Sequence, residues 1–189
     1  PEPLETWKRL QAAGAVLVQG VTDKALVTLD PDAIPIASDR ERSIVERMRE
    51  TRAALGDIIL GRLKRLPTHH RIALEDGGEL LLVHGSPADP QEALTHDMSD
   101  EEINALLGDD PADVVVCGMS HVPFDRMVGD VRVINVGSVG EAPDGEGERQ
   151  GGPSSIAHAT WIESTPSGLI VEPIVVPTGH SEVRVAVHG

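Results

Sequence analysis

The fold of this chain is decided by two stretches: Leu80-Leu81-Leu82-Val83-His84-Gly85-Ser86-Pro87 and Val114-Val115-Val116-Cys117-Gly118-Met119-Ser120-His121. Each is an apolar run, typical of a buried strand, that stops at a glycine turn and carries a histidine at or just past its end. In open α/β sheets, ligands bind at the edge formed by the carboxyl ends of the strands. A histidine at that edge can bind a metal ion or move a proton. We therefore expect a ligand-binding edge that contains His84 and His121.

The charge of the chain limits its partners. Its 189 residues include 16 Lys and Arg against 31 Asp and Glu, and the formal net charge is −15. Binding to nucleic acid depends on clustered basic residues, and the sequence has no such cluster, so we do not expect a nucleic-acid partner. No apolar run reaches the roughly 20 residues that span a membrane, and no signal-peptide pattern opens the sequence. We expect a cytoplasmic protein without a membrane partner, and oligomers are compatible with this interpretation.

The periodicity of apolar residues predicts an α/β protein in a single domain over residues 1–189. Helices are predicted over 1–14, from 38 or 39 to 55, over 57–65 and from 99 to 107, and strands over 15–18, 71–74, 79–83, 113–117, 124–127, 131–134, 156–163 and 169–176. Residues 141–154 are rich in Gly, Glu, Asp and Pro, and we interpret them as a mobile surface loop, whereas 177–189 form a tail without a clear pattern. Helices alternate with strands early and strands dominate late, which favours an α/β sandwich.

Four of the predicted strands are followed by loops that contain glycine. These loops are Gly20-Val21-Thr22-Asp23, His84-Gly85-Ser86, Gly118-Met119-Ser120-His121 and Asn135-Val136-Gly137-Ser138. Glycine at the end of a strand permits a tight turn and a close approach of the backbone to a ligand. Four such loops in order, two of them with histidine, indicate a shared site more strongly than any one of them.

This ordered set resembles the calcineurin-like metallophosphoesterases, especially their small bacterial branch. That family carries the blocks Asp-x-His, Gly-Asp, Gly-Asn-His-Asp, His-Gly-Ser-Pro and Gly-His-x-His. The chain matches the fourth block at 84–87, and it matches the fifth and third in part at 118–121 and 20–23. The resemblance extends from residue 1 to about residue 176. It implies an α/β/β/α sandwich of two mixed sheets flanked by helices, and hydrolysis of phosphate mono- or diesters by two divalent metal ions.

The family's metal ligands carry over only in part. His84 stands at a ligand position of one metal and His121 at a ligand position of the other, and the metal would be Mn, Fe, Zn or Co. Val21 and Met119 occupy former ligand positions: valine has no lone pair to donate, and a thioether is a poor ligand for hard divalent ions. Thr22 stands where the family has the histidine that acts as general acid.

Three further residues, Gly85, Ser120 and Asn135, are candidates for substrate binding. The Asp-x-His and Gly-Asp blocks lie on an N-terminal strand–helix–strand unit in the family and would precede residue 1. We therefore expect an eroded two-metal site with weak or no activity on phosphate-ester small molecules. The alternative is a pseudoenzyme that binds a protein partner through the same scaffold. Because a strand at 15–18 would lack a neighbour, we hypothesise that the native product begins upstream or that another segment fills the gap.

Overall fold

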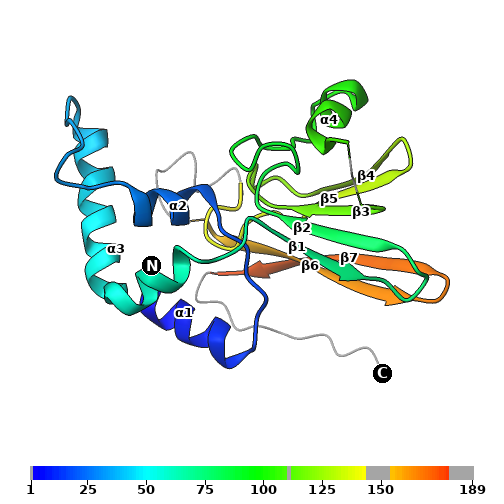
Figure 1. The fold of residues 1–189 in the computed structure, drawn as a ribbon, viewed down its shortest axis with the longest axis horizontal. Helices are drawn as coiled ribbons and strands as arrows, with labels where there is room; N and C mark the ends of the chain where they lie inside the picture. Colours follow the sequence, from blue (N-terminus) through cyan, green and yellow to red (C-terminus); the bar gives the residue numbers. More distant parts are fainter. Residues whose placement is uncertain (1, 110–111, 144–153, 179–189) are drawn as a thin grey trace. The chain divides into compact units, whose positions relative to one another are not determined.

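The computed structural model describes residues 2–109, 112–143 and 154–178. The chain divides into two compact units, Pro1–Thr68 and His69–Gly189, and each is described by itself (Figure 1). The expectation of a single domain stays a prediction. Most of the predicted surface loop over 141–154 and of the tail over 177–189 lies outside the described residues.

The first unit consists of helices around a small apolar core. The helices are α1 (Pro3–Ala12), α2 (Val21–Thr28) and α3 (Asp39–Leu63). Trp7, Leu26 and Leu63, one from each helix, are the buried residues of the core. The first helix ends where the sequence predicts it, because Gly14 adopts a φ of 64°, which ends a helix at little steric cost.

The long helix α3 is two predicted helices joined at a kink. Ser38 is its N-cap, and the Ser38 hydroxyl accepts a hydrogen bond from the backbone N–H of Glu41 at 3.2 Å. Gly56 interrupts the helical backbone with φ 71° and ψ 167°. The sequence predicted helix on both sides of this residue, and the structure adds the kink at Gly56.

The predicted strand over residues 15–18 is wrong, because these residues form no regular element. The Gln19 backbone N–H donates to the Pro67 carbonyl at 2.7 Å instead of joining a ladder. Gly20 is the N-cap of α2, and its N–H donates to the Asp23 carboxylate at 3.0 Å. The stretch from Gly20 to Asp23 therefore starts a helix rather than following a strand. A strand needs a neighbour for its backbone hydrogen bonds, and this segment has none among the described residues.

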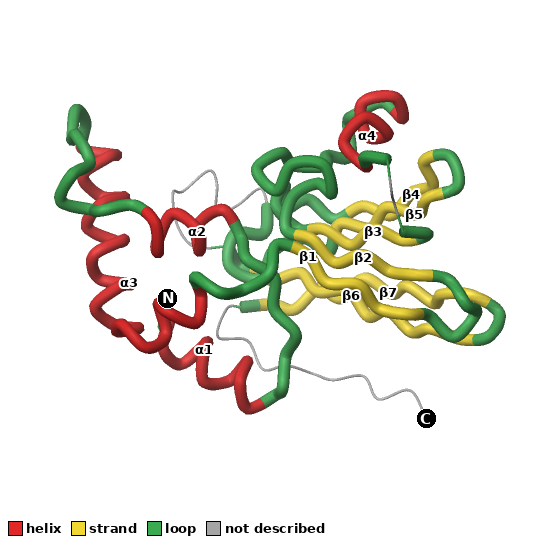
Figure 2. Tube along the Cα trace, viewed as in Figure 1, coloured by secondary structure: helices red, strands yellow, loops and turns green. Residues whose placement is uncertain are grey.

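The second unit contains a five-stranded mixed sheet and a separate two-stranded sheet (Figure 2). The strands of the large sheet are β1 (His69–Ala73), β2 (Glu79–Val83), β3 (Val114–Cys117), β4 (Phe124–Val128) and β5 (Val131–Asn135). Their order is β1-β2-β3-β5-β4, with β2, β3 and β5 parallel and both edge strands antiparallel. The small sheet pairs β6 (Ile156–Thr165) with β7 (Gly168–Pro177).

Both faces of the large sheet are covered within the second unit (Figure 1). Helix α4 (Asp100–Leu107) covers one face, where Ile103 and Leu107 are buried against residues such as Val115. The β6–β7 hairpin covers the other face, where Ile162 and other hairpin residues pack against a second apolar cluster. The prediction of an α/β fold with a mixed sheet and helices is confirmed. None of the helices in the described residues is long and apolar enough to cross a membrane.

Candidate functional site

The three parallel strands bring the predicted site loops to one edge of the sheet. Leu82 pairs with Val116, and Val116 pairs with Ile134, so β2, β3 and β5 end at nearly the same level. His84 follows the first of these strands, residues 118–121 follow the second, and Asn135 ends the third. This is the edge at which open α/β sheets bind ligands.

Backbone hydrogen bonds hold the two histidine loops together. The His84 carbonyl accepts hydrogen bonds from the N–H groups of Gly118 at 3.1 Å and Met119 at 2.9 Å. Both loops therefore lie side by side at the sheet edge, as expected from the sequence. Met119 and Ser120 are partly buried within this turn.

His121 has an unusual backbone conformation. Its φ is 62°, and among the described residues it is the only one other than glycine with a positive φ. Its N–H donates to the Gly118 carbonyl at 2.9 Å, which closes the turn. The Nδ1 atom lies 3.5 Å from the Glu141 Oε2 atom, and the two side chains are 38% and 72% exposed. Residues other than glycine that adopt left-handed backbone are concentrated at functional sites. The loop over 118–121 is therefore the more constrained of the two histidine loops.

The buried Asn135 side chain hydrogen-bonds to two loops at the carboxyl edge of the sheet. It is buried, and its Nδ2 donates to the Ser120 hydroxyl at 2.9 Å and more weakly to the Cys117 sulfur at 3.6 Å. Its Oδ1 accepts from the buried N–H of Gly137 at 2.9 Å. The Asn135 amide is thus used to join the loops that follow β3 and β5. The Ser120 hydroxyl is held by the same bond.

The His-Gly-Ser-Pro loop is a tight turn with its own internal contacts. A side chain at Gly85 would place its Cβ 2.7 Å from the carbonyl oxygens of Pro90 and Glu92. The buried Ser86 hydroxyl donates to the Asp89 carbonyl at 2.9 Å and accepts from the Asp89 N–H at 3.1 Å. The close approach of the backbone at residues 90 and 92 therefore explains why position 85 requires glycine.

Sequence reasoning missed His158, which lies on β6 beside the turn after β5. Its N–H donates to the Ser138 carbonyl at 2.8 Å. Its Nδ1 is buried and has no hydrogen-bond partner among the described residues. Gly137 has a φ of 75°, and a Cβ there would lie 2.6 Å from the Cβ of His158. In the sequence, only its position on the inward side of an alternating strand distinguishes His158.

The structure also describes Val21, at a former ligand position, and Thr22, at the position of the family's general acid. Val21 and Thr22 lie in the first turn of α2, in the first unit, with Val21 partly buried and Thr22 exposed. Within the described part of the chain, no three His, Cys, Asp or Glu side chains gather where they could hold a metal ion. Burial raises the pKa of the Cys117 thiol to about 12. The described residues therefore do not fit a two-metal centre on their own.

Strand β1 begins two residues before the strand that the sequence predicts over 71–74. His69 and His70 begin β1, where they pair with Val83 and Leu82 of the antiparallel neighbour. The hairpin that turns at Asp76–Gly78 keeps its register as far as these two residues.

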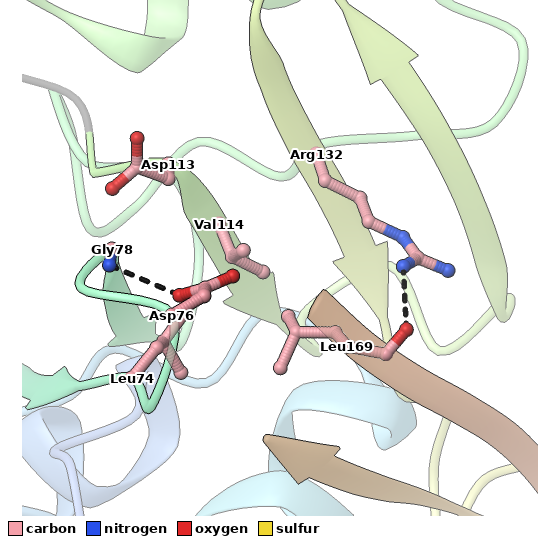
Figure 3. A pocket seen from close by; sticks show the side chains of 7 residues that line it. All are labelled: Leu74, Asp76, Gly78, Asp113, Val114, Arg132 and Leu169. Carbon is pink, nitrogen blue, oxygen red and sulfur yellow. Dashed lines mark hydrogen bonds between the residues drawn. The ribbon is translucent and has the colours of Figure 1, made fainter. Parts of the chain in front are cut away.

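A pocket of about 380 Å³ lies at the opposite end of the parallel strands (Figure 3). Its lining includes Asp76, Asp113 and Arg132, and these charged groups are already bound within the protein. Asp76 accepts from the Gly78 N–H at 3.0 Å, and the Asp113 carboxylate accepts from the Glu79 N–H at 2.8 Å. The Arg132 guanidinium donates twice to Asp125, which raises its pKa. The carboxyl edge, where the loops of three strands meet, is the better candidate site.

Comparison with known proteins gives a consistent result for the fold. A family model described as the calcineurin-like phosphoesterase superfamily domain matches residues 4–157. The chain is similar to the crystal structure of the hypothetical protein PH1004 from Pyrococcus horikoshii OT3, with 18% identity, a TM-score of 0.71, and coverage of 95% of this chain and 71% of that one. It is also similar to a metallophosphoesterase from Sphaerobacter thermophilus, with 18% identity, a TM-score of 0.58, and coverage of 83% and 64%. Comparison with curated protein sequences gave no match.

Proposed function

Because this chain belongs to the calcineurin-like phosphoesterase superfamily, we propose that it is a divergent relative of the metal-dependent hydrolases of phosphate mono- and diesters, with an eroded two-metal site. The observation that carries this proposal is the carboxyl edge of β2 and β3. Two histidine loops meet there, yet no three His, Cys, Asp or Glu side chains of the described residues gather where they could hold a metal ion.

The chemistry of the substituted positions supports weak or absent hydrolysis by residues 1–189. In this proposal His84 and His121 are the remaining metal-binding side chains, one for each metal. Loss of a group that merely supports a metal ligand costs about 10- to 100-fold in metal affinity or activity. Val21 and Met119 stand at positions where direct metal ligands are lost, so the expected loss of metal affinity is larger.

The experiment measures metal content and hydrolysis together. The protein is loaded with Mn²⁺, its metal content is determined by mass spectrometry, and its activity is assayed on p-nitrophenyl phosphate and bis-p-nitrophenyl phosphate. We expect less than one Mn²⁺ per chain and hydrolysis close to background. His84→Ala removes the proposed ligand, and His96→Ala, at an exposed histidine outside the loops of the edge, is the matched control.

Two results would contradict the proposal. Tight binding of two Mn²⁺ with high activity would show that the site is not eroded. Equal loss of residual Mn²⁺ in His84→Ala and His96→Ala would show that the carboxyl edge is not the metal-binding region. In a chain that carries the upstream Asp-x-His and Gly-Asp blocks, Val21→Asn, Thr22→His and Met119→His together are expected to raise the Mn²⁺ content, and no gain would count against the assignment of these positions.

A non-catalytic, protein-binding role is the second candidate. It is favoured by an exposed apolar face on the β6–β7 hairpin, which includes Trp161 at 57% exposure. This role does not require metal, so binding experiments without metal separate it from hydrolysis.

A further inference from the structure

The backbone of the second histidine loop holds the His121 ring in a fixed place. The bond from the His121 N–H to the Gly118 carbonyl closes the turn, and the φ of 62° is one that glycine adopts more easily than histidine. A residue other than glycine at such a position is strained, and strain of this kind is retained where the side chain has a function. The imidazole ring is therefore the part of His121 that explains its presence in the turn.

A second side chain reaches this ring from the turn that follows β5. The backbone N–H of Glu141 donates to the Ser138 hydroxyl at 3.0 Å. The carbonyl of the same serine accepts from the His158 N–H at 2.8 Å, so this turn is also bonded to β6. Both the ring and the carboxylate of Glu141 thus extend from backbone that is held by hydrogen bonds within the second unit.

The contact between the two side chains selects one ring nitrogen. The Nδ1 atom of His121 lies 3.5 Å from the Oε2 atom of Glu141, within the range of an ion pair and at the outer limit of a hydrogen bond. Neutral imidazole carries hydrogen on one nitrogen only, and the other nitrogen is an acceptor. An ionised carboxylate can only accept, so Glu141 favours the tautomer with the hydrogen on Nδ1. No other carboxylate of the described residues pairs with this ring.

The tautomer determines which ligand atoms His121 can receive. The side chain is 38% exposed, so a ligand can reach the ring from solution. With its lone pair on Nε2, the ring accepts a hydrogen bond from a hydroxyl or ammonium group, or binds a cation. The oxygens of a phosphate dianion carry only lone pairs, so they need a ring that donates from Nε2. The two tautomers therefore select opposite kinds of ligand at this position.

We propose that Glu141 is a positioning residue for His121: its carboxylate accepts the Nδ1 hydrogen and leaves the lone pair on Nε2, so that His121 receives a hydrogen-bond donor or a cation and not a bare phosphate oxygen. Carboxylates commonly orient ligand-binding histidines in this way. It follows that the anionic oxygens of a phosphate ester at this edge are held by groups other than His121. This inference rests on the proposed function only in placing His121 in the site.

The test observes the tautomer directly, in the full chain without metal. Two-dimensional ¹⁵N–¹H NMR spectra of the imidazole rings at pH 8 distinguish hydrogen on Nδ1 from hydrogen on Nε2, and His121→Gln identifies the signals of this ring. We expect His121 to carry its hydrogen mainly on Nδ1. Because Nε2 then has no hydrogen to donate, we expect inorganic phosphate to leave both ¹⁵N shifts of the ring unchanged.

Matched variants separate this role from a purely structural one. Glu141→Ala removes the carboxylate and keeps the backbone N–H that bonds to Ser138. We expect the ratio of the Nδ1–H to the Nε2–H tautomer of His121 to fall about two- to fivefold, the effect of losing an exposed charged pair. Glu163→Ala removes an exposed carboxylate from β6 and is expected to leave the ratio unchanged. A structural role of Glu141 would lower the urea midpoint without changing the tautomer.

Three results would overturn the proposal. The first is a wild-type His121 ring with hydrogen on Nε2 or on both nitrogens. The second is a tautomer ratio in Glu141→Ala that equals that of the wild type or of Glu163→Ala. The third is a shift of the His121 signals on addition of inorganic phosphate. None of these measurements involves Mn²⁺ or hydrolysis, so this proposal and the proposed function fail separately.

Discussion

Replacing Asn135 with alanine tests whether this buried amide, rather than the sheet alone, holds the two loops of the candidate site in place. The substitution removes the bond from Nδ2 to the Ser120 hydroxyl and leaves the buried N–H of Gly137 without its acceptor. A buried donor without a partner costs about 1–3 kcal/mol, and each lost hydrogen bond costs about 1 kcal/mol more. We expect local stability at the Gly137 turn to fall by about 2–4 kcal/mol.

The assay is native-state hydrogen exchange of the Gly137 amide. Each 1.4 kcal/mol corresponds to a factor of ten, so exchange is expected to accelerate about 30- to 1,000-fold. Ser120→Ala is the matched control, because it removes one partner of Asn135 but leaves the acceptor of Gly137 in place. Its expected effect is about 0.5–1.5 kcal/mol. If both variants accelerate exchange at Gly137 equally, Asn135 does not organise the turn in the way described.

Four further predictions concern local features of the fold. Gly85→Ala places a Cβ 2.7 Å from two backbone carbonyl oxygens, and we expect it to destabilise the second unit by about 1–3 kcal/mol in urea unfolding. Gly61 lies on α3 with open space beside it, so we expect Gly61→Ala to stabilise the first unit by about 1 kcal/mol. Because burial raises the pKa of the Cys117 thiol to about 12, its thiolate fraction at pH 8 is about 10⁻⁴, and Ellman's reagent is expected to label it only after denaturation. Hydrogen bonds with the backbone N–H and side chain of Ser99 lower the pKa of the Glu102 carboxyl. The stabilisation of α4 by this cap is therefore complete at pH values above the ordinary pKa of glutamate, and it is lost as the pH falls through the lowered pKa. Glu102→Ala is expected to remove that pH dependence from the exchange of the α4 amides, and an unchanged profile would contradict the capping argument.

The parts of the fold that depend on local chemistry could be predicted from the sequence. The helices that begin after Ser99 and Ser38 start where the sequence predicts them, and both serines are N-caps. The Asp76-Gly77-Gly78 turn and its flanking strands are also correct. Each of these features is set by a few neighbouring residues, so a single sequence contains the whole of the physical cause.

The error at residues 15–18 has a different origin. Ala15-Val16-Leu17-Val18 has the composition of a buried strand, but composition cannot provide the neighbour with which a strand must pair. Val16 is 55% exposed, in contrast to the buried strands of the second unit. A short apolar run thus indicates that a segment can form a strand, and the presence of a neighbouring strand determines whether it does.

The candidate site shows the same division between local and long-range causes. The histidines at 84 and 121 could be identified because each follows an apolar run, and parallel strands bring such positions to one edge. The contact between Gly137 and His158 joins a turn after β5 to a strand of the other sheet, and nothing in either local sequence specifies it. The His158 N–H also donates to the Ser138 carbonyl, so two contacts join this strand to the turn, and both link residues about 20 positions apart in the sequence.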